Sequence, residues 1–241
     1  MHFFPIAVLL VAFLYSSVGH GGASGYYAAG ILLGLDVPSL KPQVLILNLF
    51  VAGLSAFSFT RKGFFRLDLL APLALASMPC AFLGARLALP VETANRVLGA
   101  CLAAAAIRLF LHDWLQKKAW EDGFAPPRPW WLAVAGAFLG LVAGITGVGG
   151  GIYLSPLLLL TNWASPGQTA AASSWFIVLN SASALWGLSL SPGVFQLQWL
   201  WILCACGGGL LGGWIGANAL PVRWFRRMLG AALLIAAIKL F

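Results

Sequence analysis

The chain has 241 residues, of which 61% are hydrophobic and only 8% are charged. Because soluble globular domains carry about 25% charged residues, this composition excludes a water-soluble fold and predicts a protein of the lipid bilayer. The formal net charge of +8 does not indicate nucleic-acid binding, since the basic residues gather in short loops between apolar segments, as the positive-inside rule describes.

Ten apolar, helix-forming segments follow one another along the chain, and several have about the ~20 residues needed to cross a bilayer. Strand-like alternation is absent, so the predicted fold is all-α. The expected helices cover residues 2–18, 23–35, 40–60, 67–89, 93–111, 130–146, 152–163, 167–190, 196–220 and 224–241. Asp36 is expected to close the second of them before Pro38.

The two halves of the chain are homologous. Residues 88–110 match residues 219–241 at an offset of 131 positions, and Leu47-Asn48 matches Leu179-Asn180 at an offset of 132. Two membrane halves enclosing a site between them are typical of secondary transporters. We therefore predict a first membrane repeat over 1–111, a polar cytoplasmic linker over 112–129 and a second repeat over 130–241.

Each half contains two short segments around a glycine run and then three longer ones. If the short segments form a hairpin, the number of crossings is odd and the repeats are inverted. The basic loop 61–66 has an uncharged counterpart at 191–198, whereas the basic loop 221–227 has a neutral counterpart at 90–96. Inverted repeats place roughly ten of the 14 Lys and Arg residues on the cytoplasmic side, against roughly eight for parallel repeats. We therefore favour inverted repeats.

The two glycine runs, 18–25 (VGHGGASG) and 144–151 (GITGVGGG), are the most informative motifs. Such runs break a helix, permit sharp turns and expose backbone N–H groups, and the helix that follows directs the positive end of its dipole at the same place. This arrangement favours an anion. Other glycines, among them Gly30, Gly34, Gly136, Gly140 and 207–213, are expected to pack helices together.

The acidic residues lie at segment ends or in the linker, so no carboxylate is expected at mid-membrane depth to hold a cation. His20, at the tip of the first run, is either a hydrogen-bonding spacer or a group that attracts the anion or carries a coupled proton. Asn48 and Asn180 are symmetric amides that bind either the substrate or the hairpin backbone. Tyr26, Gln43, Thr169 and Ser173 are weaker candidates. The predicted substrate-binding residues are Gly19, His20, Gly21, Gly22, Ser24, Asn48, Thr146, Gly147, Gly149, Gly150, Gly151, Ser174 and Asn180.

Residues 17–38 and 140–160, together with 168–187, resemble the sulfite exporter TauE/SafE family of bacterial membrane permeases. The resemblance extends over essentially the whole chain. The second glycine run, followed by Pro156, is the more typical copy, whereas the first carries His20 and has Ala28 at the place of that proline.

The resemblance implies export of a small sulfur-containing anion, such as sulfite or an organosulfonate, across the bacterial cytoplasmic membrane by a multi-pass protein. It implies no enzyme activity, and we expect no cofactor and no metal. The expected partners are the small anion and the lipid bilayer, and a homodimer is left open. The alternatives are a passive anion channel, or a transporter of another anion such as thiosulfate or sulfate.

Overall fold

The computed structural model describes residues 3–87, 89–111, 127–190 and 198–217, and four residues of the last segment, 234–235 and 237–238. Within these residues the regular elements are helices, and no strand occurs. The predicted linker 112–129 and the predicted helix 224–241 lie almost entirely outside the described residues.

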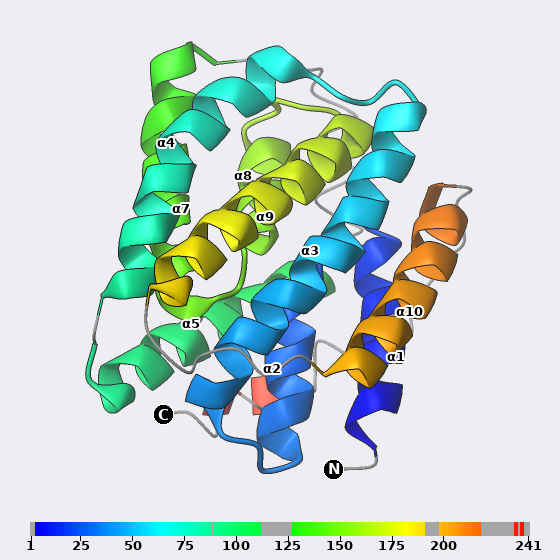
Figure 1. The fold of residues 1–241 in the computed structure, drawn as a ribbon. Coiled ribbons are helices and arrows are strands. Elements are labelled where there is room, and N and C mark those ends of the chain that lie inside the picture. The colour runs from blue at the N-terminus through cyan, green and yellow to red at the C-terminus, as the bar shows by residue number, and fades with distance from the viewer. Residues whose placement is uncertain are drawn as a thin grey trace.

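Nine helices of the described residues follow the predicted segments closely (Figure 1). The first half contains α1 (Phe4–Ser16), α2 (Ala23–Leu32), α3 (Val37–Arg61), α4 (Leu67–Arg86) and α5 (Val91–Phe110). The second half contains α7 (Pro129–Thr146), α8 (Gly151–Leu160), α9 (Pro166–Ser189) and α10 (Trp199–Ala217). Of these described helices, α3, α4 and α7 are long and apolar enough throughout to cross a membrane.

The prediction that Asp36 closes the second helix is wrong. Its side chain accepts a hydrogen bond from the backbone N–H of Ser39 at 3.1 Å, so Asp36 is the N-cap of α3. Pro38 then occupies the first turn, where a missing N–H costs nothing. The helix α2 ends instead at Leu32, and Gly34, two residues further along, has a φ of +76° that lets the chain turn back.

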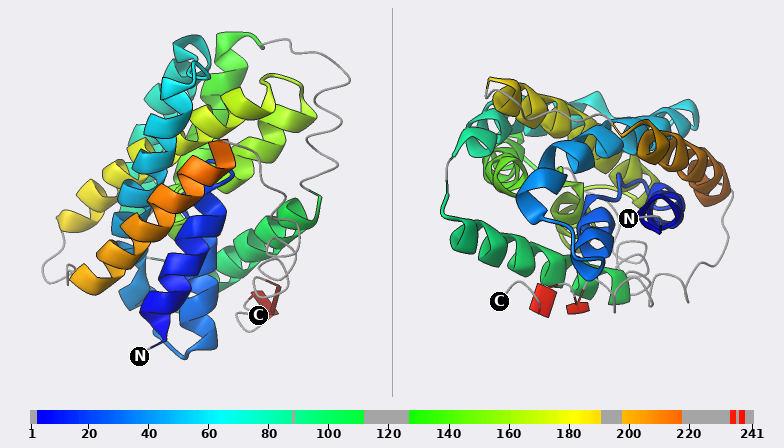
Figure 2. Two further views of the ribbon diagram at one scale, coloured as in Figure 1. Left: turned by 90° about the vertical axis from the view of Figure 1, so that its right-hand side faces the viewer. Right: turned by 60° about the horizontal axis from the view of Figure 1, so that its bottom comes forward.

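The most extensive helix contacts join the two halves of the chain. They are those of α4 with α7, of α1 with α10, and of α9 with both α3 and α4, and Figures 1 and 2 show the α4–α7 and α1–α10 pairs side by side. By position in the repeat, α1 corresponds to α7 and α4 to α10. Exchanging the two halves therefore turns the α4–α7 pair into the α10–α1 pair. The helices α3 and α9 correspond to each other and pack against each other. The helix α5 lies on one flank, against α2, α7 and α8 (Figure 2).

Glycine permits the closest of these helix contacts. A Cβ at Gly136 or Gly140 of α7 would strike the backbone of Leu73 or Ser77 on α4, so the two helices touch backbone to backbone. The packing role predicted for Gly136 and Gly140 is thus confirmed. In the other pair Gly208 and Gly212 of α10 meet α1 in the same way.

Two glycines do not pack as predicted. Gly34 and Gly207 have no atom within 4 Å of where a Cβ would stand. Gly34 serves the turn after α2, as its positive φ shows, and Gly207 lies on an open face of α10. A helical spacing of glycines therefore does not by itself identify the face that meets a neighbour.

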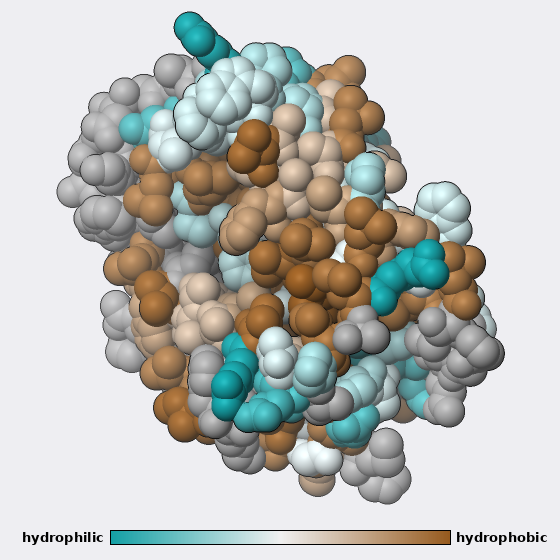
Figure 3. Space-filling view, turned by 90° about the vertical axis from the view of Figure 1, so that its left-hand side faces the viewer, coloured by the Kyte–Doolittle hydropathy of each residue, from teal (hydrophilic) through white to brown (hydrophobic). Residues whose placement is uncertain are grey.

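Large apolar side chains cover the outside of the bundle. On α4 and α7, Leu75 is 74% exposed and Phe138 is 66% exposed. Figure 3 shows that such hydrophobic residues cover the middle of this face, while hydrophilic ones gather toward its margins. A surface of this kind is stable against lipid rather than water.

Replacing Gly140 by alanine should destabilise the protein by about 1–3 kcal/mol, because the added methyl group forces α4 and α7 apart. The matched control is Gly53→Ala in α3, where no atom lies within 4 Å; that change should be neutral or stabilising by up to about 1 kcal/mol. Thermal unfolding of the detergent-purified protein measures both. Equal melting temperatures for the two variants would contradict the packing role of Gly140.

Candidate functional site

Both glycine runs are helix breaks in the structure. The first lies between α1 and α2 and the second between α7 and α8. Five of their glycines have a left-handed backbone: Gly19, Gly22, Gly147, Gly149 and Gly150, with φ between +75° and +98°. Residues with a Cβ rarely adopt this conformation. These five positions therefore favour glycine.

The two helices that follow the runs begin without a side-chain cap. Gly22 is the N-cap of α2 and Gly150 is the N-cap of α8, and neither offers a side-chain acceptor to the first turn. The first-turn N–H groups and the positive ends of both helix dipoles are therefore directed toward the runs. An anion next to either run would be stabilised by this field.

Asn48 of α3 lies between the two runs. A Cβ at Gly21 would strike its carboxamide oxygen, and a Cβ at Gly149 would stand 2.9 Å from its Nδ2. The residue is wholly buried, and neither its Oδ1 nor its Nδ2 has a hydrogen-bond partner. Because an unsatisfied buried amide costs about 1–3 kcal/mol, this side chain is the strongest candidate in the structure for binding a ligand.

The helix α9, like α3, packs against both glycine runs. Ile177 packs against Gly21, Gly149 and Gly151, and the Oγ of Ser181, one turn further along, lies 3.3 Å from where a Cβ of Gly149 would stand. Ser181 is fully buried and its hydroxyl group has no partner. A second hydrogen-bonding group therefore accompanies the carboxamide of Asn48.

His20 connects the first run to the second half of the chain. Its Nε2 lies 2.9 Å from the Oγ of Ser155 on α8, and Ser155 lies 2.8 Å from the Oγ of Ser173 on α9. The Nδ1 of His20 donates to the carbonyl oxygen of Val18 at 2.9 Å, since a carbonyl accepts only. His20 itself is buried.

The protonation state of His20 determines the direction of the hydrogen bond to Ser155. Neutral imidazole with a proton on Nδ1 accepts the Ser155 hydroxyl proton at Nε2. Imidazolium donates at Nε2 instead, and the Ser155 hydroxyl then donates to the carbonyl oxygen of Gly151, 3.1 Å away. The arrangement is thus suited both to a spacer and to a proton carrier, the two roles left open by the sequence.

The remaining predicted residues surround this centre in different ways. Ser174 donates to the carbonyl oxygen of Gly19 at 2.8 Å, and the Ser24 hydroxyl shares a hydrogen bond of 2.6 Å with Tyr15. Thr146 donates to the carbonyl oxygen of Val142 and accepts from the N–H of Val148. The hydrogen bonds of these side chains fix the conformation of the runs.

Asn180 differs from its symmetric counterpart. It is 1% exposed and both of its amide atoms are without a partner, but it is not among the nearest neighbours of any glycine in the two runs. The structure therefore brings Asn48 directly between the runs, while Asn180 is a second buried amide on α9.

The space between the runs is nearly closed in this conformation. A cavity of about 10 Å³ is lined by residues of both runs, among them His20, Gly21 and Val148. A single water needs about 10–15 Å³, so an oxyanion enters only after the surrounding helices move. The space beside the runs is therefore too small for an oxyanion in this conformation.

Ser155, Ser181, Tyr15 and Lys41 were not predicted from the sequence. Ser155 follows Gly151 by four residues, so the two lie on one face of α8, and Ser181 has the same spacing from Ile177. A polar residue one helical turn from a run was the signal that could have identified Ser155. Lys41 begins the second turn of α3, away from the basic loops.

Replacing Gly149 by alanine should destabilise the protein by about 1–2 kcal/mol, because an L-residue is strained at φ +78° and the methyl group would press on Asn48. Gly209→Ala in α10 is the control, since its methyl group would meet Leu54 at 3.3 Å without backbone strain. Thermal unfolding of both variants checks this, and a Gly149→Ala protein as stable as Gly209→Ala would show that the run tolerates a Cβ.

The sequence of this chain matches known proteins over nearly its whole length. The family described as "Sulfite exporter TauE/SafE" matches residues 4–240. A curated relative, "Probable membrane transporter protein y4hK" of Sinorhizobium fredii (strain NBRC 101917 / NGR234), is 34% identical over 238 residues, which cover 98% of this chain and 96% of the relative. No solved structure matches the chain. The chain belongs to the sulfite exporter TauE/SafE family and is a multi-pass membrane transporter.

Proposed function

We propose that this protein is a secondary transporter that exports a small sulfur-containing anion, sulfite or an organosulfonate, across the bacterial cytoplasmic membrane. The observation that carries the proposal is the wholly buried, unpartnered carboxamide of Asn48 between Gly21 and Gly149. The anion would accept hydrogen bonds from Asn48 Nδ2, from Ser181 and from backbone N–H groups of the two runs. Family membership supports the transport activity.

The charges near the runs favour an anion over a cation. The three described carboxylates lie at helix starts: Asp36 caps α3, Asp68 lies in the first turn of α4 and Glu92 in the first turn of α5. Asp68 and Glu92 pair with Arg66 and Arg96. The groups around Asn48 are amides, hydroxyls and helix N-termini, which bind anions through N–H and O–H donors.

We also propose that the two halves are inverted repeats, as secondary transporters often are. In Figure 1, α3 begins at the lower end of the molecule and ends at the upper end, whereas its counterpart α9 runs the opposite way. The repeated α4–α7 and α10–α1 pairs support a two-fold relation between the halves. Movement of the helices that surround the runs would expose Asn48 to each side in turn.

The small volume beside the runs, about 10 Å³, favours a carrier over the alternative, a passive channel, because a channel needs a continuous path wide enough for the anion. In liposomes, a carrier should show saturable flux that is accelerated by anion on the opposite side. The panel to be compared is sulfite, thiosulfate, sulfate, sulfonates and carboxylates. Flux that rises linearly with concentration and shows no counter-flow would favour the channel.

Replacing Asn48 by aspartate keeps the shape of the side chain but places a negative charge and an acceptor where the anion binds. Asn48→Asp should abolish transport, and Asn48→Leu should raise KM by about 10- to 100-fold, since a hydrogen bond to a charged group contributes about 1.5–3 kcal/mol. Asn162→Asp, beyond the end of α8, is the charge-matched control and should transport normally. Wild-type kinetics in Asn48→Asp, with the protein folded, would overturn the proposed site.

If His20 carries a coupled proton, His20→Gln should flatten the pH dependence of transport between pH 5 and 8, because glutamine keeps a hydrogen-bonding group but does not titrate. His20→Val, which copies Val148 of the second run, should weaken substrate binding further. Initial rates across this pH range measure both effects. Unchanged profiles in both variants would assign His20 to the spacer role, with Ser155 as its structural partner.

A further inference from the structure

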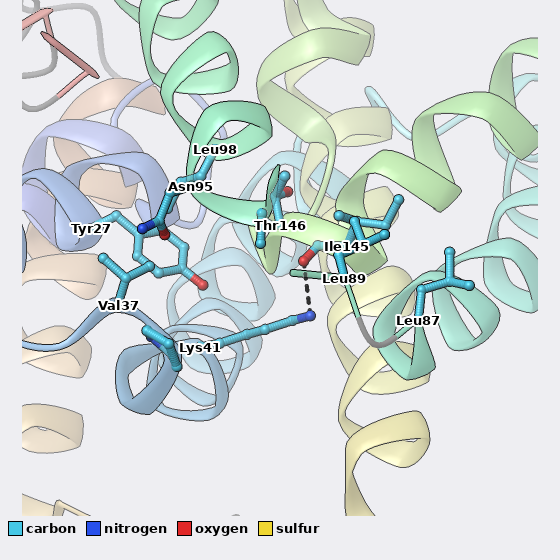
Figure 4. A pocket seen from close by; sticks show the side chains of 11 residues that line it. Tyr27, Val37, Lys41, Leu87, Leu89, Asn95, Leu98, Ile145 and Thr146 are labelled. Carbon is cyan, nitrogen blue, oxygen red and sulfur yellow. Dashed lines mark hydrogen bonds between the residues drawn. The ribbon is translucent and has the colours of Figure 1, made fainter. Parts of the chain in front are cut away.

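We propose that a second anion site lies at one end of the molecule, where Lys41 and Tyr27 receive the anion before it reaches, or after it leaves, Asn48. This inference rests on the proposed function. The site is a cavity of about 240 Å³ between α2, the start of α3, the α4–α5 connection and the end of α7. Figure 4 shows the side chain of Lys41 extending across it toward Ile145.

The cavity is large enough for a small oxyanion with part of its hydration shell, because one water takes about 30 Å³ in the liquid. It is much larger than the cavity of about 10 Å³ beside His20 and Gly21. Its lining combines apolar residues such as Val37 and Leu98 with a few polar groups, the usual composition of a small-molecule site.

Lys41 gives this cavity a positive charge that no described carboxylate neutralises. Its Nζ donates to the carbonyl oxygen of Ile145 at 2.9 Å, and one ammonium group carries three N–H donors. The described ion pairs are those of Arg66 with Asp68 and of Arg96 with Glu92. A half-buried cation without a counter-charge is costly in a membrane protein, and a bound anion would offset that cost.

Tyr27 supplies a second donor independently of the charge. It is wholly buried, and its hydroxyl group has no hydrogen-bond partner. Figure 4 shows this hydroxyl directed into the cavity, toward Lys41 and Thr146. A buried hydroxyl left without a partner costs free energy, so Lys41 and Tyr27 are both arranged for a ligand that accepts hydrogen bonds.

The cavity borders the second glycine run. A Cβ at Gly147 would stand 2.6 Å from the Tyr27 hydroxyl and 2.9 Å from Cγ of Lys41. On α3, Asn48 follows Lys41 by seven residues, which places it two turns further along the same face, about 10 Å away. The run 147–149 therefore touches Lys41 at one end and Asn48 at the other, and the anion would pass along it.

The end of the molecule at which this cavity opens follows from the helix directions. It is lined by the start of α3 and the residues after α4, whereas the basic loop 61–66 joins the other ends of these two helices. Since such a basic loop favours the cytoplasm, the cavity would face the opposite side of the membrane. For an exporter, Lys41 would then bind the anion on its way out.

Lys41 also lies at the C-terminal end of α7, where a cation stabilises the helix dipole. A lysine that serves only this purpose would affect stability and not substrate affinity. The test therefore measures both quantities for the same variants, and the conservative change to arginine keeps the charge.

Initial rates of sulfite and sulfonate transport into liposomes would be compared for Lys41→Gln, Lys41→Arg and Tyr27→Phe, with Lys62→Gln at the opposite end as the control. Lys41→Gln should raise KM at least tenfold with a smaller effect on kcat, Lys41→Arg should stay within about threefold of the wild type, and Tyr27→Phe should raise KM about threefold or more. Melting temperatures would be recorded in parallel.

Lowered melting temperature with wild-type KM in Lys41→Gln would reduce the lysine to a cap of α7 and overturn the proposal. If Lys41→Gln fails to fold, an unchanged KM in Tyr27→Phe would overturn it instead. Loss of transport in Asn48→Asp together with unchanged KM in the Lys41 and Tyr27 variants would leave the proposed function intact and remove only the second site. Absence of transport of any panel anion by the wild type would remove both.

Discussion

Two helix breaks inside an apolar bundle impose the main constraint on this structure. Backbone N–H and C=O groups outside a helix cannot face lipid, because no water is present to satisfy them. They must therefore be enclosed by protein or line a polar cavity. Here the runs between α1 and α2 and between α7 and α8 are enclosed by α3 and α9, and the polar residues that face them, Asn48 and Ser181, come from those two helices.

The tight packing of the outer helix pairs supports this enclosure. Gly140 lets α7 touch the backbone of α4, and Gly212 lets α10 touch α1. Each pair combines one helix from each half, so the halves interlock rather than form separate domains. Because the halves interlock, the two glycine runs lie close together, and His20 of the first half reaches Ser155 of the second. A transport cycle must move these contacts together.

Much of the fold could be predicted from the sequence because apolar segments and glycine runs are local signals. The boundaries of the described helices agree with the predicted segments to within a few residues. Asp36 was misassigned although an aspartate just before a proline is a signal for the start of a helix. The inverted relation of the halves stays a prediction. Which glycines pack could not be predicted, since Gly140 and Gly207 differ only in what faces them.

The candidate site was harder to predict than the fold. The symmetry of Asn48 and Asn180 suggested equal roles, but only Asn48 lies among the nearest neighbours of the runs. The sequences of the two halves are symmetric, but the surroundings of the two amides in this structure are not. Sequence symmetry therefore could not show which amide faces the runs. Lys41 was missed because loop lysines dominate the charge pattern, and its position in a cavity depends on α2, α5 and α7, which are distant in sequence.

The central claim is that an oxyanion binds to Asn48 between the two glycine runs. Selenite, which resembles sulfite in shape and charge, carries an anomalous scatterer, so a crystal of the protein grown with selenite would locate the anion directly. If the anion binds there, an anomalous peak lies within hydrogen-bond distance of Asn48 Nδ2, bordered by Gly21 and Gly149. A peak at a different place in the protein, with none between the runs, would contradict it.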